Sequence, residues 1–226
     1  MPGRASPQES GTRSSRGDAR DVVLVHGLWY GPVSLALMAR RLEARGFRTH
    51  SFSYPTLGQG LASNARALFD FVRERELSHL DLVGHSLGGL VILRMLDEWS
   101  GLPPGRVVLL GSPVRGSATV SKIVQKPWTR PLVGQARNAL EYGFAHAPAG
   151  RDTGVIAGTR PVGLGRVFER LEPPHDGTIA VAETRLPGAA DQLELPVSHT
   201  GLVLGSEVVD AVEAFLRRGH FARDDS

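Results

Sequence analysis

The residue whose type and surroundings most clearly suit it to a chemical reaction is Ser86, at the centre of the stretch Gly-His-Ser-Leu-Gly at residues 84–88. An apolar run at residues 80–83, typical of a buried strand, precedes it, and a helical pattern at residues 87–99 follows it. A serine on so sharp a strand-to-helix turn has its hydroxyl lifted above the end of a sheet, and the flanking glycines leave room for the turn. Serine is also a common N-cap of helices, and five letters alone are a weak signal. Partners further along the chain decide between the two interpretations.

Ser86 needs a base and an acid before its hydroxyl can act as a nucleophile. Histidine is the base best suited to this near neutral pH, and an acid orients the imidazole and stabilises its charged form. Downstream of Ser86, the segment His-Asp-Gly-Thr-Ile supplies Asp176, and the segment Pro-Val-Ser-His-Thr-Gly supplies His199. The order serine, acid, histidine is one of the orders in which such triads occur. The sequence therefore predicts a nucleophile at Ser86, a general base at His199 and an orienting acid at Asp176.

The elements that must position these residues alternate between strands and helices from residue 21 onward. Patterns typical of strands occur at residues 22–25, 47–54, 80–83, 107–110, 155–157 and 192–195. Patterns typical of helices occur at residues 33–44, 60–76, 87–99 and 206–217. This alternation predicts an α/β fold, with a mostly parallel sheet covered by helices on both faces. Reactive groups in such folds lie beyond the carboxyl ends of the strands, where Ser86 and Asp176 are expected and where His199 follows the last strand.

Two other aspartates compete with Asp176 for the role of the acid. Asp-Gly is a turn signal, so Asp176 could also be an ordinary turn residue. Asp152 and Asp191, however, each precede a predicted strand and are expected at the wrong end of the sheet. These positions favour Asp176.

Seven histidines besides His199 are present, and none of them follows the acid, comes after an apolar segment and precedes the last helix. His26 is expected to shape the loop after the first strand, His85 to point away from the serine, and His175 to line the cleft. The others carry no motif and are expected at the surface: His50, His79, His146 and His220.

Taken together, these motifs resemble those of alpha/beta-hydrolases of the lipase and esterase type, close to the small bacterial members and to the lipase-like region of the PGAP1-type hydrolases. The resemblance runs from about residue 21 to about residue 218. It rests on Val-Leu-Val-His-Gly-Leu-Trp at residues 23–29, Gly-His-Ser-Leu-Gly-Gly at 84–89, Gly-Ser-Pro-Val-Arg-Gly-Ser at 111–117, Asp-Gly-Thr-Ile at 176–179 and Ser-His at 198–199.

The resemblance implies an alpha/beta-hydrolase domain over residues 21–226 that cleaves small-molecule or lipid esters through an acyl-enzyme, without a metal or cofactor. It also implies an oxyanion hole made of two backbone N–H groups. One is that of Leu87, at a helix N-terminus where the dipole favours negative charge. The other lies in the loop after the first strand, at Leu28 or alternatively at Trp29.

Two other functions are compatible with the same residues. A Ser-His-Asp triad can transfer the acyl group to another acceptor or cleave thioesters or amides, and the fold does not decide between these reactions. The chain could also be a non-catalytic binding protein on a hydrolase scaffold, although the intact triad argues against this.

Composition limits the classes of protein that the chain can represent. Its length of 226 residues, apolar content of 41% and charged content of 22% are typical of one soluble globular domain. The absence of cysteine excludes a disulfide framework and fits a reducing, cytoplasmic location. The net charge of +3 comes from dispersed arginines, so we expect no nucleic-acid partner. No apolar run reaches the length of a transmembrane helix.

Two segments are expected to lie outside the regular pattern. Residues 1–20 are polar and rich in Arg, Ser and Gly, which predicts a disordered leader. Residues 113–150 contain four prolines and several aromatic residues, and could form either a short lid or an irregular crossover with one helix at residues 132–142. If this segment folds over the cleft, the aromatic residues expected to line it are Trp128, Tyr142 and Phe144.

Overall fold

Six parallel strands form the centre of the molecule in the computed structural model, which describes residues 19–28, 30–117, 143–162 and 171–223. Their order across the sheet is β2-β1-β3-β4-β5-β6, and every neighbouring pair is parallel. The strands are β1 (Asp21–Val25), β2 (Arg48–Phe52), β3 (Asp81–His85), β4 (Val107–Leu110), β5 (Thr153–Gly158) and β6 (Asp191–Leu195).

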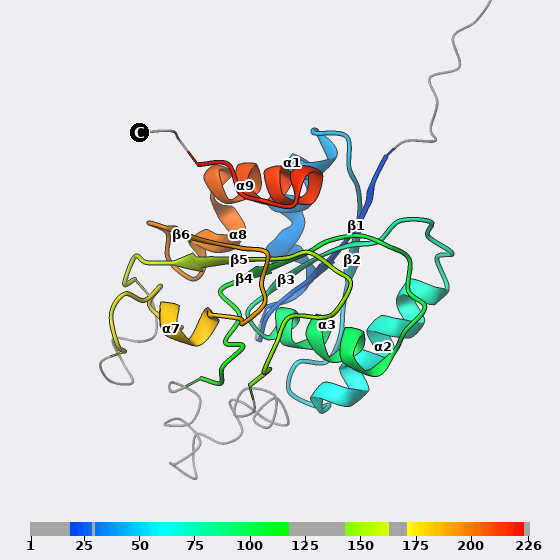
Figure 1. The fold of residues 1–226 in the computed structure, drawn as a ribbon, viewed down its shortest axis with the longest axis horizontal. Helices are drawn as coiled ribbons and strands as arrows, with labels where there is room; N and C mark the ends of the chain where they lie inside the picture. Colours follow the sequence, from blue (N-terminus) through cyan, green and yellow to red (C-terminus); the bar gives the residue numbers. More distant parts are fainter. Residues whose placement is uncertain (1–18, 29, 118–142, 163–170, 224–226) are drawn as a thin grey trace, which may run out of the picture.

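Helices cover both faces of this sheet (Figure 1). One face carries α2 (Leu61–Arg73) and α3 (Leu87–Glu98), and the other carries α1 (Ala36–Glu43) and α9 (Ser206–Arg218). Short helices complete the described part of the chain: η1 (Pro32–Leu35), α7 (Val181–Thr184) and α8 (Gly201–Leu204). The expected α/β fold with a helix-covered sheet is therefore confirmed.

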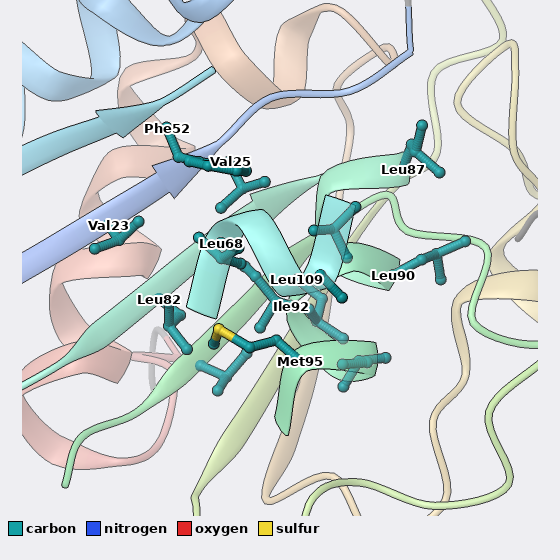
Figure 2. Packing of buried hydrophobic residues seen from close by; sticks show 14 of the residues in the cluster. Val23, Val25, Phe52, Leu68, Leu82, Leu87, Leu90, Ile92, Met95 and Leu109 are labelled. Carbon is teal, nitrogen blue, oxygen red and sulfur yellow. The ribbon is translucent and has the colours of Figure 1, made fainter. Parts of the chain in front are cut away.

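The strands read as continuous apolar runs because both of their faces are buried. In β1, Val23 and Val25 pack with α2 and α3, while Val22 and Leu24 pack on the α1 and α9 side. Figure 2 shows the first of these two cores, in which Leu68 of α2 and Met95 of α3 meet strand side chains. Because side chains alternate along a strand, each strand anchors two helical layers at once.

The chain reverses its direction across the sheet at β1. It passes from β1 outward to β2, then returns to β3 on the other side of β1 and continues to the far edge. The carboxyl ends of β1 and β3 are therefore the topological switch point of the sheet, which is where ligands bind in open α/β folds. The loop after β1 and the turn after β3 are the two segments at this switch point.

The structure differs from the sequence-based expectation in two details. The helix expected at residues 33–44 begins as the 3-10 turn η1 and continues as α1. The pattern did not predict α7 or α8, because helices of four residues are too short to display a periodicity.

The expected leader and lid fall largely outside the described residues. Residues 1–18 lie outside them, as do residues 118–142 with Trp128, Tyr142 and the helix expected at 132–142. Arg20 is described and forms an ion pair with Asp81 at 2.9 Å. Phe144 is also described, and it is half-buried and packs against the core that includes α2 and α3. No described helix is long and apolar enough to cross a membrane.

Helix α3 lies unusually close to the ends of β1 and β3. A Cβ atom on Gly88 would overlap the carbonyl oxygen of Val25 and lie 2.6 Å from that of His26. A Cβ on Gly84 would lie 2.6 Å from the Cα of Gly89. These distances are shorter than any that real Cβ atoms adopt, so this packing requires glycine.

We predict that Gly88→Ala lowers the free energy of unfolding by about 2 kcal/mol or more, because the added methyl group must displace backbone rather than a flexible side chain. Urea denaturation followed by circular dichroism measures the change. Gly58→Ala is the matched control, since its nearest neighbour would be Pro55 Cβ at 4.0 Å. The control should stay within about 0.5 kcal/mol of wild type, and equal stability of the two variants would contradict the packing argument.

Candidate active site

Ser86 occupies a strained turn between β3 and α3. Its backbone has φ 52° and ψ −120°, a left-handed conformation that costs a non-glycine residue about 1–3 kcal/mol. The Ser86 N–H donates to the carbonyl of Leu110 at 2.9 Å, and the Ser86 carbonyl accepts from Gly89 N–H at 3.1 Å. The side chain makes no capping hydrogen bond to the helix. Ser86 therefore stands at the N-cap position of α3 without capping the helix through its side chain, and its hydroxyl is not used in a capping bond.

Asp176 and His199 form a buried pair. The Nδ1 atom of His199 lies 2.6 Å from Oδ2 of Asp176, and the backbone N–H of His199 donates to the Asp176 carbonyl at 2.9 Å. The other carboxylate oxygen accepts N–H bonds from Thr178 at 2.8 Å and Ile179 at 2.7 Å. A carboxylate can only accept, so Nδ1 carries the proton and Nε2 presents its lone pair. His199 is thereby held in the tautomer that a general base needs.

Gly111 marks the point at which these groups converge. It directly follows β4, whose last residue Leu110 is bonded to Ser86. A Cβ on Gly111 would lie 3.1 Å from Oδ2 of Asp176 and 3.3 Å from Nδ1 of His199. The structure therefore brings the Asp176–His199 pair to the same edge of the sheet as the Ser86 turn.

Asp152 and Asp191, the two aspartates that compete with Asp176, lie at the amino ends of the strands. Asp152 directly precedes β5 and pairs with Arg106 at 3.1 Å. Asp191 begins β6, pairs with Arg223 and accepts the backbone N–H of Phe221 at 2.9 Å. Neither of them contacts His199 in the described structure.

His50 and His79 are partly exposed at the surface, but each also has a carboxylate partner that the sequence did not indicate. Both are half-buried, with the Nε2 atom of His50 2.8 Å from Asp21 and that of His79 3.0 Å from Asp81. Both carboxylates begin strands, so these pairs belong to the amino ends of the sheet. His146 and His220, which have no such partner strand beside them, are exposed.

His26 shapes the loop after β1, as expected. Its Nδ1 contacts the carbonyl of Gly27 at 3.1 Å, its own carbonyl accepts the hydroxyl of Tyr54 at 2.7 Å, and its ring stacks on Tyr54. His175 is half-buried beside the acid and contacts the N–H of Gly177 through Nδ1 at 3.1 Å.

His85 has contacts that the sequence did not indicate. Its ring is completely buried, and Nε2 lies 3.2 Å from the carbonyl oxygen of His199. The two imidazole rings are 4.7 Å apart between centroids, tilted by 45°. The sequence around His85 did not predict its contact with His199, because the two residues are far apart in the chain.

Burial sets the charge of the imidazoles around the site. Desolvation lowers the pKa of His85 well below the ordinary histidine value, and the nearby His199 and His26 lower it further. Desolvation also lowers the pKa of His26, opposed in part by its bond to Gly27. Both rings are therefore neutral at the pH at which an ordinary histidine titrates.

Two backbone segments flank the serine where an oxyanion would form. Leu87 begins α3, so its N–H is one of the unpaired donors at a helix N-terminus. Gly27 lies directly against Ser86, since a Cβ placed on it would be 3.0 Å from Ser86 Cβ. Leu28 follows Gly27 and is buried, whereas Trp29 lies outside the described residues. Among the described residues, no group of three or more His, Cys, Asp or Glu side chains is arranged to hold a metal ion.

Comparison with known proteins decides the family. The sequence matches the alpha/beta hydrolase family over residues 22–223. The chain belongs to the alpha/beta hydrolase family. No curated protein sequence matches it significantly. The relation to PGAP1-type hydrolases in particular stays a prediction.

Solved structures share the fold of this alpha/beta hydrolase at low sequence identity. The mature lipase BlEst2 of Bacillus licheniformis is 19% identical with a TM-score of 0.73, covering 89% of this chain and 92% of that one. The esterase EaEST of Exiguobacterium antarcticum is 15% identical with a TM-score of 0.60, covering 89% and 93%. The ydeN gene product of B. subtilis is 17% identical with a TM-score of 0.63, covering 88% and 100%.

We predict that the free energy of unfolding declines as the pH falls below about 6.5. In this range His26 and His85 become protonated in the unfolded chain but stay neutral in the folded chain. The groups facing His85 are His199, His26 and the ring of Tyr30. His85→Gln removes one of the two groups that bind a proton only in the unfolded chain. Its pH dependence between pH 7.5 and 5.5 should therefore be shallower than that of wild type by about 1 kcal/mol.

Urea denaturation at three pH values in this interval measures both curves. The sign follows from the lowered folded pKa: the stabilisation is complete above the unfolded pKa and is lost on acidification. Parallel curves for wild type and His85→Gln would contradict a neutral, buried His85.

Proposed function

We propose that this chain is a serine hydrolase of carboxylic esters. The observation that carries the proposal is the buried 2.6 Å contact between Asp176 and His199, at the edge of the sheet where Ser86 occupies its left-handed turn. An aspartate that fixes the Nδ1–H tautomer of a histidine is the arrangement that prepares Nε2 to take a proton from a serine. The same pair would have no evident purpose at a site that only binds ligands.

The reaction proceeds through an acyl-enzyme. His199 Nε2 takes the proton of the Ser86 hydroxyl as Oγ bonds to the ester carbonyl carbon. The protonated imidazole then gives this proton to the leaving alcohol as the carbon–oxygen ester bond breaks. A water molecule repeats the sequence, with His199 again as base, and frees the carboxylic acid and the serine. Asp176 stays ionised throughout and stabilises the imidazolium.

Backbone N–H groups stabilise the oxyanion that forms in both halves of the reaction. Leu87 and Leu28 are the proposed donors, since one begins α3 directly after the nucleophile and the other follows Gly27 beside Ser86. Removal of one such donor costs about 100- to 1,000-fold in other serine hydrolases. Backbone donors need no particular side chain, which is consistent with leucine at both positions.

Hydrolysis of esters is the proposed reaction, with small-molecule or lipid esters as substrates. Transfer of the same acyl group to an alcohol or thiol, or cleavage of a thioester, requires no change in the roles of the three residues. These alternatives stay predictions, and competition between water and added acyl acceptors separates them from hydrolysis.

We predict that Ser86→Ala abolishes hydrolysis of p-nitrophenyl esters of short and medium chain length, with a loss of about a million-fold in kcat. A fluorophosphonate probe should label wild type at Ser86 and leave the variant unlabelled. Thermal unfolding should be retained, since alanine at this position removes only a hydroxyl. A variant that keeps a tenth of wild-type activity would refute Ser86 as the nucleophile.

Asp176→Asn should lower kcat by about 10,000-fold, because an amide presents the wrong hydrogen bond to Nδ1 of His199. Asp191→Asn is the matched control, since the same atom change there affects only contacts at the amino ends of the strands, with Arg223 and with the N–H groups of Gln192 and Phe221. The control should keep activity within about twofold, because these contacts lie at the opposite ends of the strands from His199 and Ser86. Steady-state kinetics on one ester compares the two, and greater damage from the control would mean that the acid has been misassigned.

A further inference from the structure

His85 has no role in the reaction proposed above, although it is the residue next to the nucleophile. It is the last residue of β3, and its imidazole is fully buried. A buried polar ring must be hydrogen-bonded to avoid a desolvation cost. Only one of its two nitrogens is: Nε2 contacts the His199 carbonyl at 3.2 Å, while Nδ1 has no partner in the described structure.

The identity of the acceptor fixes the tautomer of His85. A backbone carbonyl can only accept a hydrogen bond, so Nε2 of His85 carries the proton and Nδ1 is a bare lone pair. Desolvation lowers the pKa of this ring, so it stays a neutral donor while His199 gains and loses its proton. A donor with constant charge keeps the same hydrogen bond throughout a reaction cycle.

The backbone of His199 is held at both of its polar groups. Its N–H donates to the Asp176 carbonyl at 2.9 Å, and its carbonyl accepts from His85 at 3.2 Å. The first bond fixes His199 to the acid. The second fixes His199 to the strand that ends directly before Ser86. The ring contact of 4.7 Å between the centroids of His85 and His199 adds to this restraint.

The other side of the His85 ring contacts the loop after β1. A Cβ on Gly27 would lie 3.0 Å from Nδ1 of His85, and the ring of Tyr30 meets that of His85 edge-on at 5.2 Å. Tyr30 in turn contacts Thr200, the residue after His199, through their hydroxyls at 3.0 Å. His85 is therefore packed between the loop that follows β1 and the loop that carries His199.

We propose that His85 is a positioning residue, which sets the distance and orientation between His199 and Ser86 through its Nε2–H bond to the His199 carbonyl. This inference rests on the proposed function, because it assigns His85 a task within the same triad. A catalytic group displaced by 1 Å can lose about 100-fold in rate. His85 acts on the rate of the chemical step and has little effect on the binding of substrate, since its buried ring touches no open surface.

Two amide substitutions separate this role from simple packing. In His85→Gln the side-chain amide reaches the place of Nε2 and can still donate to the His199 carbonyl. In His85→Asn the amide lies at the place of Nδ1 and falls short of it. Both variants bury a neutral amide, so a packing role predicts similar damage from each. His79→Gln is the control. His79 lies just before the amino end of β3, and its ring contacts Asp81.

The experiment measures the rate of inactivation by a fluorophosphonate together with kcat and KM for a p-nitrophenyl ester. We expect His85→Asn to lower kcat and the inactivation rate by about 10- to 100-fold, with KM changed less than threefold. His85→Gln should recover to within about threefold of wild type, and His79→Gln should match wild type. If His85→Asn shows no cooperative unfolding transition, His85→Leu replaces it and should show the same loss relative to His85→Gln.

The outcomes distinguish the two proposals. A wild-type protein that is neither labelled at Ser86 nor active on esters refutes the proposed function. A labelled, active wild type with equal rates in folded Gln and Asn (or Leu) variants leaves that function intact and overturns the role of His85. A loss confined to KM would also overturn it, because it would place His85 in substrate binding.

Discussion

The left-handed backbone at Ser86 is the constraint on which the rest of the site depends. It exists because β3 ends and α3 begins within one residue, and α3 then lies against the carbonyl oxygens at the end of β1. A Cβ atom on Gly88 would overlap these oxygens, and Cβ atoms on Gly84 and Gly89 would collide with α3 and with Ser112. The cost of the strained φ is small compared with the burial of the apolar side of α3 in the core that Figure 2 shows. Tertiary packing thus holds a conformation that the local sequence would not adopt alone.

The parallel sheet explains why residues from distant parts of the chain meet. Because every strand runs in one direction, the segments after β1, β3, β4 and β6 all emerge at one edge (Figure 1). The buried histidines there differ in their partners. The ring nitrogens of His199 include one that contacts a carboxylate, whereas the hydrogen-bond partners of the His26 and His85 rings are backbone carbonyls. Desolvation lowers the pKa of His26 and of His85, so burial keeps these two rings in their neutral form.

Much of the fold was predictable from the sequence, since long apolar runs and amphipathic patterns report burial directly. The pairing of Asp176 with His199 also followed, because strand polarity alone places Asp152 and Asp191 at the wrong edge. The contact between His85 and His199 could not be predicted, as it depends on the loop conformations after β3 and β6. The same holds for the half-buried His50, whose carboxylate partner Asp21 comes from the neighbouring strand rather than from a neighbouring position in the chain.

The amino ends of the strands form a second polar edge with a different character. Asp21, Asp81, Asp152 and Asp191 lie at the starts of four strands, and each is paired with an arginine. These ion pairs join segments distant in sequence on the side of the sheet away from Ser86. Insertions or replacements in the loops at the reactive edge therefore leave strand register and these pairs untouched. Such a separation gives the protein scope to diverge in substrate range during evolution while it inherits an unchanged scaffold.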